Sequence, residues 1–130
     1  MGKKRILVVD DEAGFTRLLK MNLEKTGDYE VMTENRSTKA MMAAKMFRPH
    51  AILLDIVMPE MDGGDVQVQL AGDPQTKDIP VIMLTALVDE NETSPGAVAQ
   101  SGATNVLAKP VNMVILLECL DDVTKDVEVD

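Results

Sequence analysis

Aromatic side chains, cysteine and histidine are scarce in this sequence of 130 residues, which has two phenylalanines, one tyrosine, one cysteine, one histidine and no tryptophan. The lone Cys119 excludes an internal disulfide framework and a zinc site built from several cysteines, and it is consistent with a reducing compartment. Basic residues are also outnumbered, with 13 against 22 acidic ones and a net charge of −9. We therefore expect no nucleic-acid partner, because affinity for a phosphate backbone depends on Lys and Arg.

Long hydrophobic runs are absent as well. The longest apolar stretch, from Ile79 to Val88, is interrupted by Pro80 and Thr85, and it falls far below the ~18 residues of a membrane span. The basic N-terminus is followed by only four apolar residues before two acids, which does not fit a signal peptide. We expect one cytoplasmic domain over residues 1–130 with no membrane partner, a core over about residues 4–123, fraying after Leu120 and an acidic tail over 124–130.

Short apolar runs, most of them rich in β-branched residues, recur along the chain and are too short to be helices. Their hydrophobicity is continuous rather than alternating, which is typical of parallel strands that are covered on both faces. The runs are Ile6–Val9, a weaker one at Tyr29–Thr33, Ala51–Leu54, Val81–Leu84 and Val106–Ala108.

Segments with a helical spacing of apolar residues separate these runs. Phe15, Leu19 and Leu23 fall on one face of a predicted first helix, which ends near Gly27. A second helix is predicted over Ser37–Phe47. Asn112 is the predicted N-cap of the last helix.

Two segments are harder to interpret. Asp65–Leu70 alternates like a strand, but we predict a helix because it lies between two buried strands, where a parallel connection needs a crossover. Asp89–Ser101 contains a Pro-Gly pair, so we expect a loop first and helix only over Ala97–Ser101. The whole pattern is β-α repeated five times, which indicates a doubly wound α/β fold with a parallel sheet.

Polar side chains follow the predicted strands at their carboxyl ends, which is where open parallel sheets bind ligands. The first run is followed by Asp10 and Asp11, the third by Asp55, the fourth by Thr85 and the fifth by Lys109. We therefore expect these groups at one edge of the sheet. Any one of them alone could be a turn or capping residue, and only the whole set indicates a site.

Carboxylates held together repel one another, and a divalent cation relieves that repulsion. Ligands that are all oxygen favour a hard ion such as Mg2+. Lys109 adds a positive charge and Thr85 a hydroxyl donor, and both suit phosphoryl oxygens. A candidate nucleophile, a metal and two donors are the parts that phosphoryl transfer requires.

Four stretches, taken in order and at their spacing, resemble the CheY-like receiver domain of two-component response regulators. The resemblance runs from about Lys4 to Val123, which is nearly the whole chain. It implies a flavodoxin-like (βα)5 fold with five parallel strands in the order 2-1-3-4-5. The four stretches are ILVVDDE (Ile6–Glu12), LLDIVMPEMDG (Leu53–Gly63), MLTA (Met83–Ala86) and AKP (Ala108–Pro110).

The resemblance also implies roles for single residues. Asp55 is implied as the phosphoacceptor, which takes a phosphoryl group from the phosphohistidine of a sensor histidine kinase or a phosphotransfer protein. Thr85 and Lys109 are implied as contacts of the phosphoryl oxygens. The implied Mg2+ ligands are Asp10, Asp11, Asp55 and the backbone carbonyl of Val57.

The loops of the implied site have residues typical of the family, with one departure. Pro59 and Gly63 resemble the turn-shaping residues after the acceptor strand, and the Lys109–Pro110 peptide is implied to be cis. The family's usual switch is an aromatic residue three positions before the lysine, and this chain has Val106 there. A weaker conformational response, or a different signalling route, is therefore expected.

The leading hypothesis is a receiver that is phosphorylated on Asp55 and signals through a phosphorylation-dependent surface to an unknown protein, without a fused output domain. An Mg2+-dependent phosphohydrolase with an aspartyl nucleophile is a second hypothesis, disfavoured because Val57 stands where such enzymes have an acid/base Asp. A flavin-binding protein is disfavoured by the acidic residues after the first strand and the scarce aromatics. A docking receiver that is never phosphorylated ranks low because the full set of site residues is present.

Overall fold

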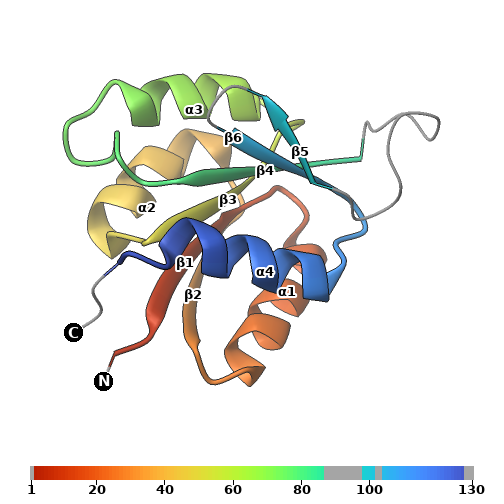
Figure 1. Ribbon diagram of the computed structural model, residues 1–130. Coiled ribbons are helices and arrows are strands. Elements are labelled where there is room, and N and C mark those ends of the chain that lie inside the picture. The colour runs from red at the N-terminus through yellow and green to blue at the C-terminus, as the bar shows by residue number, and fades with distance from the viewer. Residues whose placement is uncertain (1, 87–97, 102–103, 128–130) are drawn as a thin grey trace.

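Five parallel strands form the centre of the molecule, as the apolar runs predict (Figure 1). The computed structural model describes residues 2–86, 98–101 and 104–127. The strands are β1 (Lys4–Val9), β2 (Tyr29–Glu34), β3 (Ala51–Asp55), β4 (Val81–Thr85), β5 (Val98–Ser101) and β6 (Thr104–Ala108). The helices are α1 (Ala13–Lys25), a 3-10 turn η1 (Ser37–Lys39), α2 (Ala40–Phe47), α3 (Gly63–Ala71) and α4 (Met113–Thr124).

The sheet has the order β2-β1-β3-β4-β6-β5. Its five parallel strands therefore run 2-1-3-4-5 when β6 is counted as the fifth, which confirms the predicted topology. Because all five point the same way, their carboxyl ends lie along one edge of the sheet. This common edge brings together residues that are far apart in the sequence.

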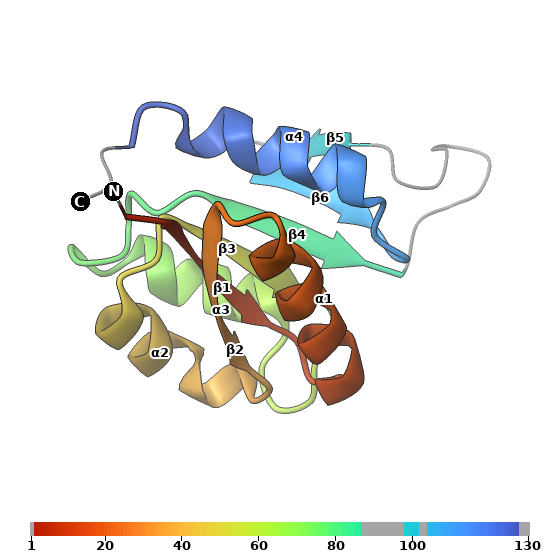
Figure 2. The same ribbon diagram turned by 90° about the horizontal axis from the view of Figure 1, so that it is seen from below.

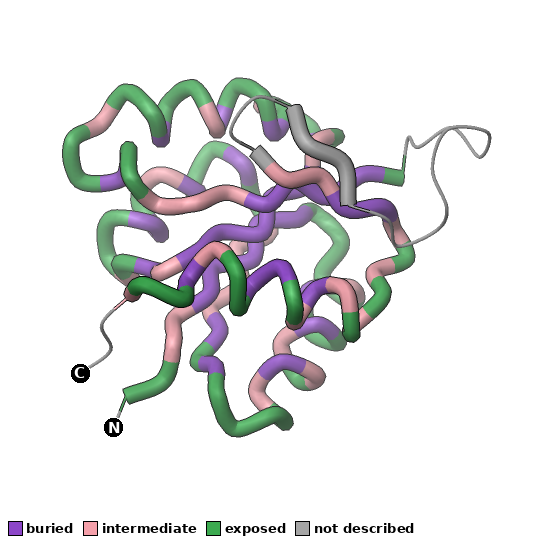
Figure 3. The backbone as a smooth tube through the Cα atoms, in the orientation of Figure 1, coloured by how far each residue is buried: buried purple, intermediate pink, exposed green. Residues whose placement is uncertain are grey.

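Alternate side chains of each central strand enter two hydrophobic cores on opposite faces of the sheet. Ile6 and Val8 of β1 pack with α1 and α4, whereas Leu7 and Val9 pack with α2 and α3. Figures 1 and 2 show these helix pairs on the two faces, and Figure 3 shows that the central strands are the most buried part of the chain. Burial on both sides is the reason for the continuous hydrophobicity of the runs, since each large apolar side chain contributes about 1.5–3 kcal/mol when it leaves water.

The predicted helices form with the expected caps. Asn112 caps α4, because its side chain accepts a hydrogen bond from the N–H of Ile115 at 3.2 Å. The alternating segment Asp65–Leu70 is helical within α3, and Asp62 caps that helix through the N–H of Asp65 at 2.9 Å. The need for a crossover between β3 and β4 thus outweighs the local strand-like pattern.

The predicted helix over Ala97–Ser101 is wrong for the part that the structure describes. Val98–Ser101 is the strand β5, which pairs antiparallel with β6. Pairing with β6 gives the backbone N–H and C=O groups of this short segment hydrogen-bond partners. In a single helical turn most of these groups would have none. The predicted loop over residues 89–96 lies outside the described residues.

The last helix is longer than expected. We predicted fraying after Leu120, but α4 continues to Thr124, whose side chain is fully buried and donates a hydrogen bond to the carbonyl of Leu120 at 2.6 Å. Asp121 and Asp122 are exposed on the outer face of the helix, whereas Leu116 and Leu120 on its inner face pack on the sheet. Among the helices that the structure describes, none is long and apolar enough to cross a bilayer.

Candidate functional site

Three carboxylates converge where β1 and β3 end. Asp10 directly follows β1 and is fully buried, Asp55 is the last residue of β3 and is 5% exposed, and Asp11 is exposed. One carboxylate oxygen from each residue lies within 4.8 Å of the others. The register accounts for this, because Val9 pairs with Leu54 and the next residue of each strand therefore reaches the same point on the edge.

Lys109 supplies the positive charge of this cluster from the end of β6. Its ammonium lies 2.5 Å from Oδ2 of Asp10, 3.1 Å from Oε1 of Glu12 and 3.7 Å from Oδ2 of Asp55. It also lies 4.4 Å from the centre of the Phe15 ring, a cation–π distance. The side chain is thus held over the carboxylates by contacts from α1 and the loop before it.

The pKa values of Asp55 and Lys109 are both raised in this cluster. Burial, and then the nearby Asp10 carboxylate, raise the pKa of Asp55 above its ordinary 3.8, although Lys109 and the N–H of Val57 oppose the shift. Burial alone would lower the pKa of Lys109, but hydrogen bonds to Asp10 and Glu12 outweigh it and raise that pKa. Added positive charge near Asp55 would therefore stabilise its ionised form.

The donor set of this cluster fits a hard divalent ion. Asp10, Asp11 and Asp55 offer only oxygen ligands, and two of the three carboxylates are almost inaccessible to water. The N–H of Glu12 donates to Oδ1 of Asp10 at 2.9 Å, which fixes the orientation of that carboxylate. The N–H of Val57 lies 3.4 Å from Oδ1 of Asp55, so the backbone of Val57 is beside the same carboxylate.

Thr85 lies on β4, the strand beside that of Asp55, and Val106 lies on β6, one strand further along the sheet. Thr85 ends β4, is nearly buried, and its carbonyl accepts the N–H of Lys109 at 2.8 Å. Val106 pairs with Met83 of β4 and packs, half-buried, against the core beneath α2 and α3. Thr85 is therefore at the edge with the charged residues, whereas Val106 lies three residues back from Lys109 within β6.

The loop-shaping residues predicted from the sequence border the cluster. The Lys109–Pro110 peptide is cis, as predicted. Gly63 begins α3 directly against the end of β3, and a Cβ atom at this position would lie 2.4 Å from the carbonyl oxygen of Asp55. Pro59 lies between Asp55 and Gly63, and its carbonyl accepts a hydrogen bond from the hydroxyl of Ser37 at 2.9 Å.

Several neighbours of the site were not singled out as site residues from the sequence. Glu12 and Phe15 hold Lys109, while Asn35 and Ser37 contact the loops that bear the carboxylates. Asn35 and Ser37 follow the strand β2, so the same search at strand ends would have found them. The apolar run of β2 is the weakest of the five, so its end is the least conspicuous in the sequence.

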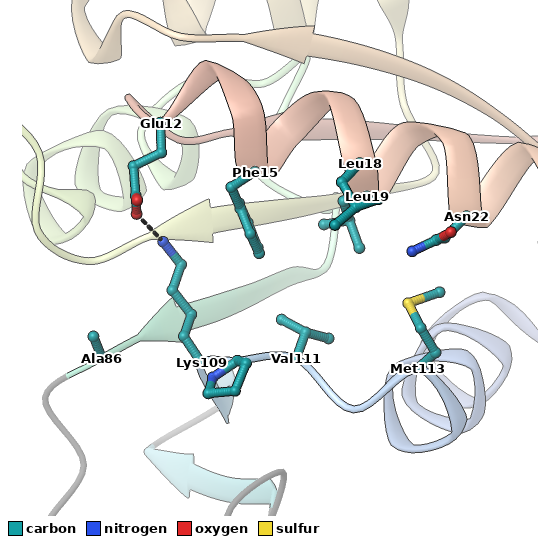
Figure 4. Close-up of a pocket in the computed structure, with 10 residues that line it drawn as sticks. Glu12, Phe15, Leu18, Leu19, Asn22, Ala86, Lys109, Val111 and Met113 are labelled. Carbon is teal, nitrogen blue, oxygen red and sulfur yellow. Dashed lines mark hydrogen bonds and ion pairs between the residues drawn. The ribbon is translucent and has the colours of Figure 1, made fainter.

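An apolar groove opens beside Lys109, between α1 and the start of α4. It has a volume of about 470 Å³, and its lining includes Phe15, Leu18, Val111 and Met113. Figure 4 shows Glu12 and Lys109 at one end of the groove and Asn22 and Met113 at the other. The groove thus continues from the charged cluster along the side of α1 that faces the start of α4.

Fold and site together define a doubly wound domain with an acidic, lysine-bearing site at the carboxyl edge of its sheet. A family model described as the response regulator receiver domain matches residues 6–121 of the chain. This match covers most of the sequence, including every residue of the charged cluster. The chain belongs to the response regulator receiver domain family and is a receiver domain of two-component signalling.

Individual relatives agree with this assignment. The chain is 40% identical over 122 residues to the response regulator PleD of Caulobacter vibrioides, covering 93% of this chain and 26% of that protein. It is 37% identical over 113 residues to RpaA of Synechocystis, a DNA-binding dual master transcriptional regulator, covering 87% of this chain and 46% of that protein. The chain therefore spans less than half the length of these curated relatives.

Solved structures give the same result for the fold. The chemotaxis protein CheY4 of Vibrio cholerae superposes with a TM-score of 0.77 at 31% identity, over 93% of this chain and 98% of that one. The receiver domain of a signal transduction histidine kinase from Syntrophus aciditrophicus also has a TM-score of 0.77, at 30% identity over 98% and 93% of the two chains. Receiver domains bind Mg2+ at an acidic pocket and interact with histidine kinases or phosphotransfer proteins, and Asp10, Asp11 and Asp55 form such an acidic cluster here.

Proposed function

We propose that this domain accepts a phosphoryl group on Asp55, in an Mg2+-dependent reaction, from the phosphohistidine of a sensor kinase or phosphotransfer protein in the cytoplasm. The observation that carries the proposal is the meeting of three carboxylates and one ammonium group at the edge of the sheet. In the reaction a carboxylate oxygen of Asp55 forms a bond to phosphorus while the bond from phosphorus to the histidine nitrogen breaks. The phosphoryl group moves intact, so no oxidant or reductant is needed.

The metal ligands in this proposal are Asp10, Asp11, Asp55 and the backbone carbonyl of Val57. The ion would neutralise charge that the carboxylates and the phosphoryl oxygens accumulate together. Asp10 is oriented by the N–H of Glu12 and is already paired with Lys109, so its charge is held in place before a donor arrives. Asp11 is exposed and can adjust its position as ligands bind.

Lys109 and Thr85 are the proposed partners of the transferred group. Lys109 lies 3.7 Å from Asp55, close enough for its ammonium to bind a phosphoryl oxygen on that carboxylate. The Thr85 hydroxyl would donate to another oxygen. These two contacts would bias the segments that follow β4 and β6 toward a second conformation. A protein target would bind that conformation with a different affinity. With valine at position 106, the aromatic residue of the family's usual switch is absent from this position.

The proposal is tested by incubating the protein with acetyl phosphate and measuring its intact mass. We expect a gain of one phosphoryl group in Mg2+ and none in EDTA, because the bare carboxylates repel a phosphodonor. No gain in Mg2+ would contradict phosphorylation and favour a docking receiver. Release of many phosphate equivalents per protein in a steady-state phosphatase assay would instead indicate a phosphohydrolase.

The apolar groove beside Lys109 is the proposed contact surface for the phosphodonor. A donor must bring its phosphohistidine to Asp55, and the groove is the apolar surface that begins next to that point. Leu18 lines the groove yet is 57% exposed, and Met21 on the next turn of α1 is 63% exposed. An amphipathic helix of the donor would cover these side chains.

Replacing Leu18 by Glu is expected to slow phosphotransfer from a histidine kinase that phosphorylates the wild type. We expect about a tenfold loss or more, because burying an unpaired carboxylate in an apolar contact costs well over the ~1.4 kcal/mol that a tenfold change represents. Labelling by acetyl phosphate should stay unchanged, since a small donor does not use the groove. The measurement is the rate of phosphotransfer from the radiolabelled kinase.

Met42→Glu is the matched control for this prediction. Met42 is 65% exposed on α2, which covers the opposite face of the sheet (Figure 2). Met42→Glu places the same charge at a similarly exposed position on a helix away from the groove. Its rate of phosphotransfer should therefore match that of the wild type. Equal rates for Leu18→Glu and Met42→Glu would show that the donor docks elsewhere.

A further inference from the structure

Two polar side chains between β2 and α2 contact both loops that bear the acidic cluster. They are Asn35, directly after β2, and Ser37, the first residue of the 3-10 turn η1. Neither is a metal ligand or a contact of the phosphoryl group in the function proposed above. Their hydrogen bonds nevertheless run to backbone atoms beside Asp10 on one side and to the loop after Asp55 on the other.

Asn35 holds the turn that carries the first two carboxylates. Its side-chain N–H2 donates to the carbonyl oxygen of Asp10 at 2.8 Å and to Oγ1 of Thr16 at 3.0 Å. The Thr16 hydroxyl in turn donates to the carbonyl of Ala13 at 3.1 Å. Asn35 therefore joins the end of β1 to the first turn of α1. The peptide plane that it fixes is the one between Asp10 and Asp11, so it sets the direction in which the exposed Asp11 side chain leaves the chain.

Ser37 holds the loop between Asp55 and Gly63. Its hydroxyl, which is buried, donates to the carbonyl of Pro59 at 2.9 Å and accepts the N–H of Met61 at 3.2 Å. The same N–H lies 2.8 Å from the Pro59 carbonyl, so the hydroxyl bridges a tight three-residue turn. Glu60 at its centre has φ 71°, a left-handed conformation that costs a residue with a side chain about 1–3 kcal/mol. The two hydrogen bonds of Ser37 help to hold the turn in this conformation.

Arg36, between these two residues, contributes less. Its ion pair with Glu60 spans 3.4 Å between side chains that are both more than half exposed. Such surface pairs stabilise proteins by about 0–1 kcal/mol. The buried hydroxyl and the amide are therefore the contacts that matter, because buried hydrogen-bonding groups left without partners are costly.

We propose that Asn35 and Ser37 are positioning residues that hold the Asp10–Asp11 turn and the 56–62 loop in the arrangement that binds the divalent ion. This inference rests on the proposed function, since it assumes that the cluster binds Mg2+. Without either side chain the ligands remain in the chain, but the loops that carry them sample more conformations. Ion binding then has to order them, so affinity falls while the ion-bound state stays close to that of the wild type.

The expected signature is a split between affinity and maximal rate. Ser37→Ala and Asn35→Ala should each weaken divalent-ion binding by about tenfold, the lower end of what loss of an outer hydrogen bond costs in metal sites. The Mg2+ concentration for half-maximal labelling by acetyl phosphate should rise by a similar factor. The labelling rate at saturating Mg2+ should change less than about twofold, because bound ion restores the arrangement.

The test measures Mn2+ binding by electron paramagnetic resonance of the free ion, with Mg2+ as competitor, together with thermal unfolding of each variant. Thr38→Ala is the matched control, because it removes an exposed hydroxyl one residue away that makes no hydrogen bond among those of the described residues. Ser37→Thr keeps the hydroxyl and should retain most of the affinity. A purely structural role would lower the unfolding temperature without changing the ion affinity of the folded protein at low temperature.

The outcomes separate this inference from the function on which it rests. If the wild type binds no ion and takes no phosphate, the proposed function itself fails. If the wild type binds and Asn35→Ala and Ser37→Ala bind equally well, the positioning role is wrong while the function stands. Should Ser37→Ala fail to fold, Asn35→Ala and Ser37→Thr decide the matter, because the first must lose affinity and the second must keep it.

Discussion

Asp55→Asn is expected to abolish labelling by acetyl phosphate in Mg2+, with no phosphoryl adduct in the intact mass after an incubation that labels all of the wild type. The amide has the shape of the carboxylate and can still accept the N–H of Val57. It has neither the negative charge that binds a divalent ion nor a nucleophilic oxygen that forms an acyl phosphate. The loss should therefore be complete rather than partial.

Asp78→Asn provides the control for this variant. Asp78 is exposed and lies before β4, at the other end of that strand from Thr85. It should be labelled like the wild type. Labelling of Asp55→Asn to the same extent as Asp78→Asn would show that another residue is the acceptor.

Asp55→Asn should also raise the thermal stability of the ion-free protein at neutral pH. Burial and Asp10 raise the pKa of Asp55 in the folded protein above its ordinary 3.8. As the pH rises past about 4, the unfolded chain ionises this group first, and above the folded pKa the ionised carboxylate destabilises the fold. We expect an increase of a few degrees in the unfolding temperature, since ~1 kcal/mol corresponds to about 3–5 °C in a domain of this size. The gain should shrink as the pH falls and vanish below about pH 3, where the wild-type carboxyl is protonated in both states.

Gly63→Ala is expected to destabilise the protein by about 3 kcal/mol, the upper end of the usual cost of overpacking a close contact. The added Cβ would lie 2.4 Å from the carbonyl oxygen of Asp55 and 2.9 Å from Cα of Ile56. Both are backbone atoms, so β3 and the start of α3 must separate, and the 2.7 Å hydrogen bond from the N–H of Gly63 to Ile56 is lost. Chemical denaturation measures the change in free energy of unfolding.

Gly14→Ala is the control for the glycine substitution. Gly14 lies in the first turn of α1, and a Cβ there meets no atom within 4 Å. Alanine should stabilise the protein by about 0.5–1 kcal/mol, because glycine is the poorer helix former. A loss of stability in Gly14→Ala as large as that in Gly63→Ala would show that backbone contact is not the cause.

The divergence of Asp55→Asn and Gly63→Ala follows from what each residue does. Asp55 is a charged group in a buried place, which the fold tolerates at a cost in stability and the proposed chemistry requires. Gly63 makes no bond to substrate or ion, but its missing side chain lets α3 begin against the end of β3. Asp55→Asn should therefore gain stability and lose phosphorylation, whereas Gly63→Ala should lose stability.

The strands and the acidic set could be predicted from the sequence for local reasons. A strand buried on both faces needs an uninterrupted apolar run, and Ile6–Val9 and Ala51–Leu54 both show one. The residue after such a run lies at the carboxyl edge whichever helix follows it. Asp10 and Asp55 could therefore be assigned to one edge without knowledge of any contact. The helix over Asp65–Leu70 could be predicted because two parallel strands need a crossover connection.

Segments without such a run were the ones predicted wrongly. Val98–Ser101 is too short and too mixed in composition to favour helix or strand, and its pairing with β6 decided the outcome. Thr124 looked like part of a polar end, but its hydroxyl is satisfied within α4, so the helix could bury it. In both cases the partner that settles the conformation is not visible in the local pattern.

By itself, the sequence determined that this is a parallel α/β receiver with Asp10, Asp55 and Lys109 at one edge, because hydrophobic periodicity and the order of its motifs follow from the chain alone. Only the tertiary structure decided how those groups meet: that Lys109 is shared among Asp10, Glu12 and Asp55, and that Asn35 and Ser37 hold the two loops of the site. The physical reason is that a hydrogen bond or an ion pair depends on distances of a few ångströms between side chains distant in sequence. Strand register and loop conformation set those distances, and no local pattern records them.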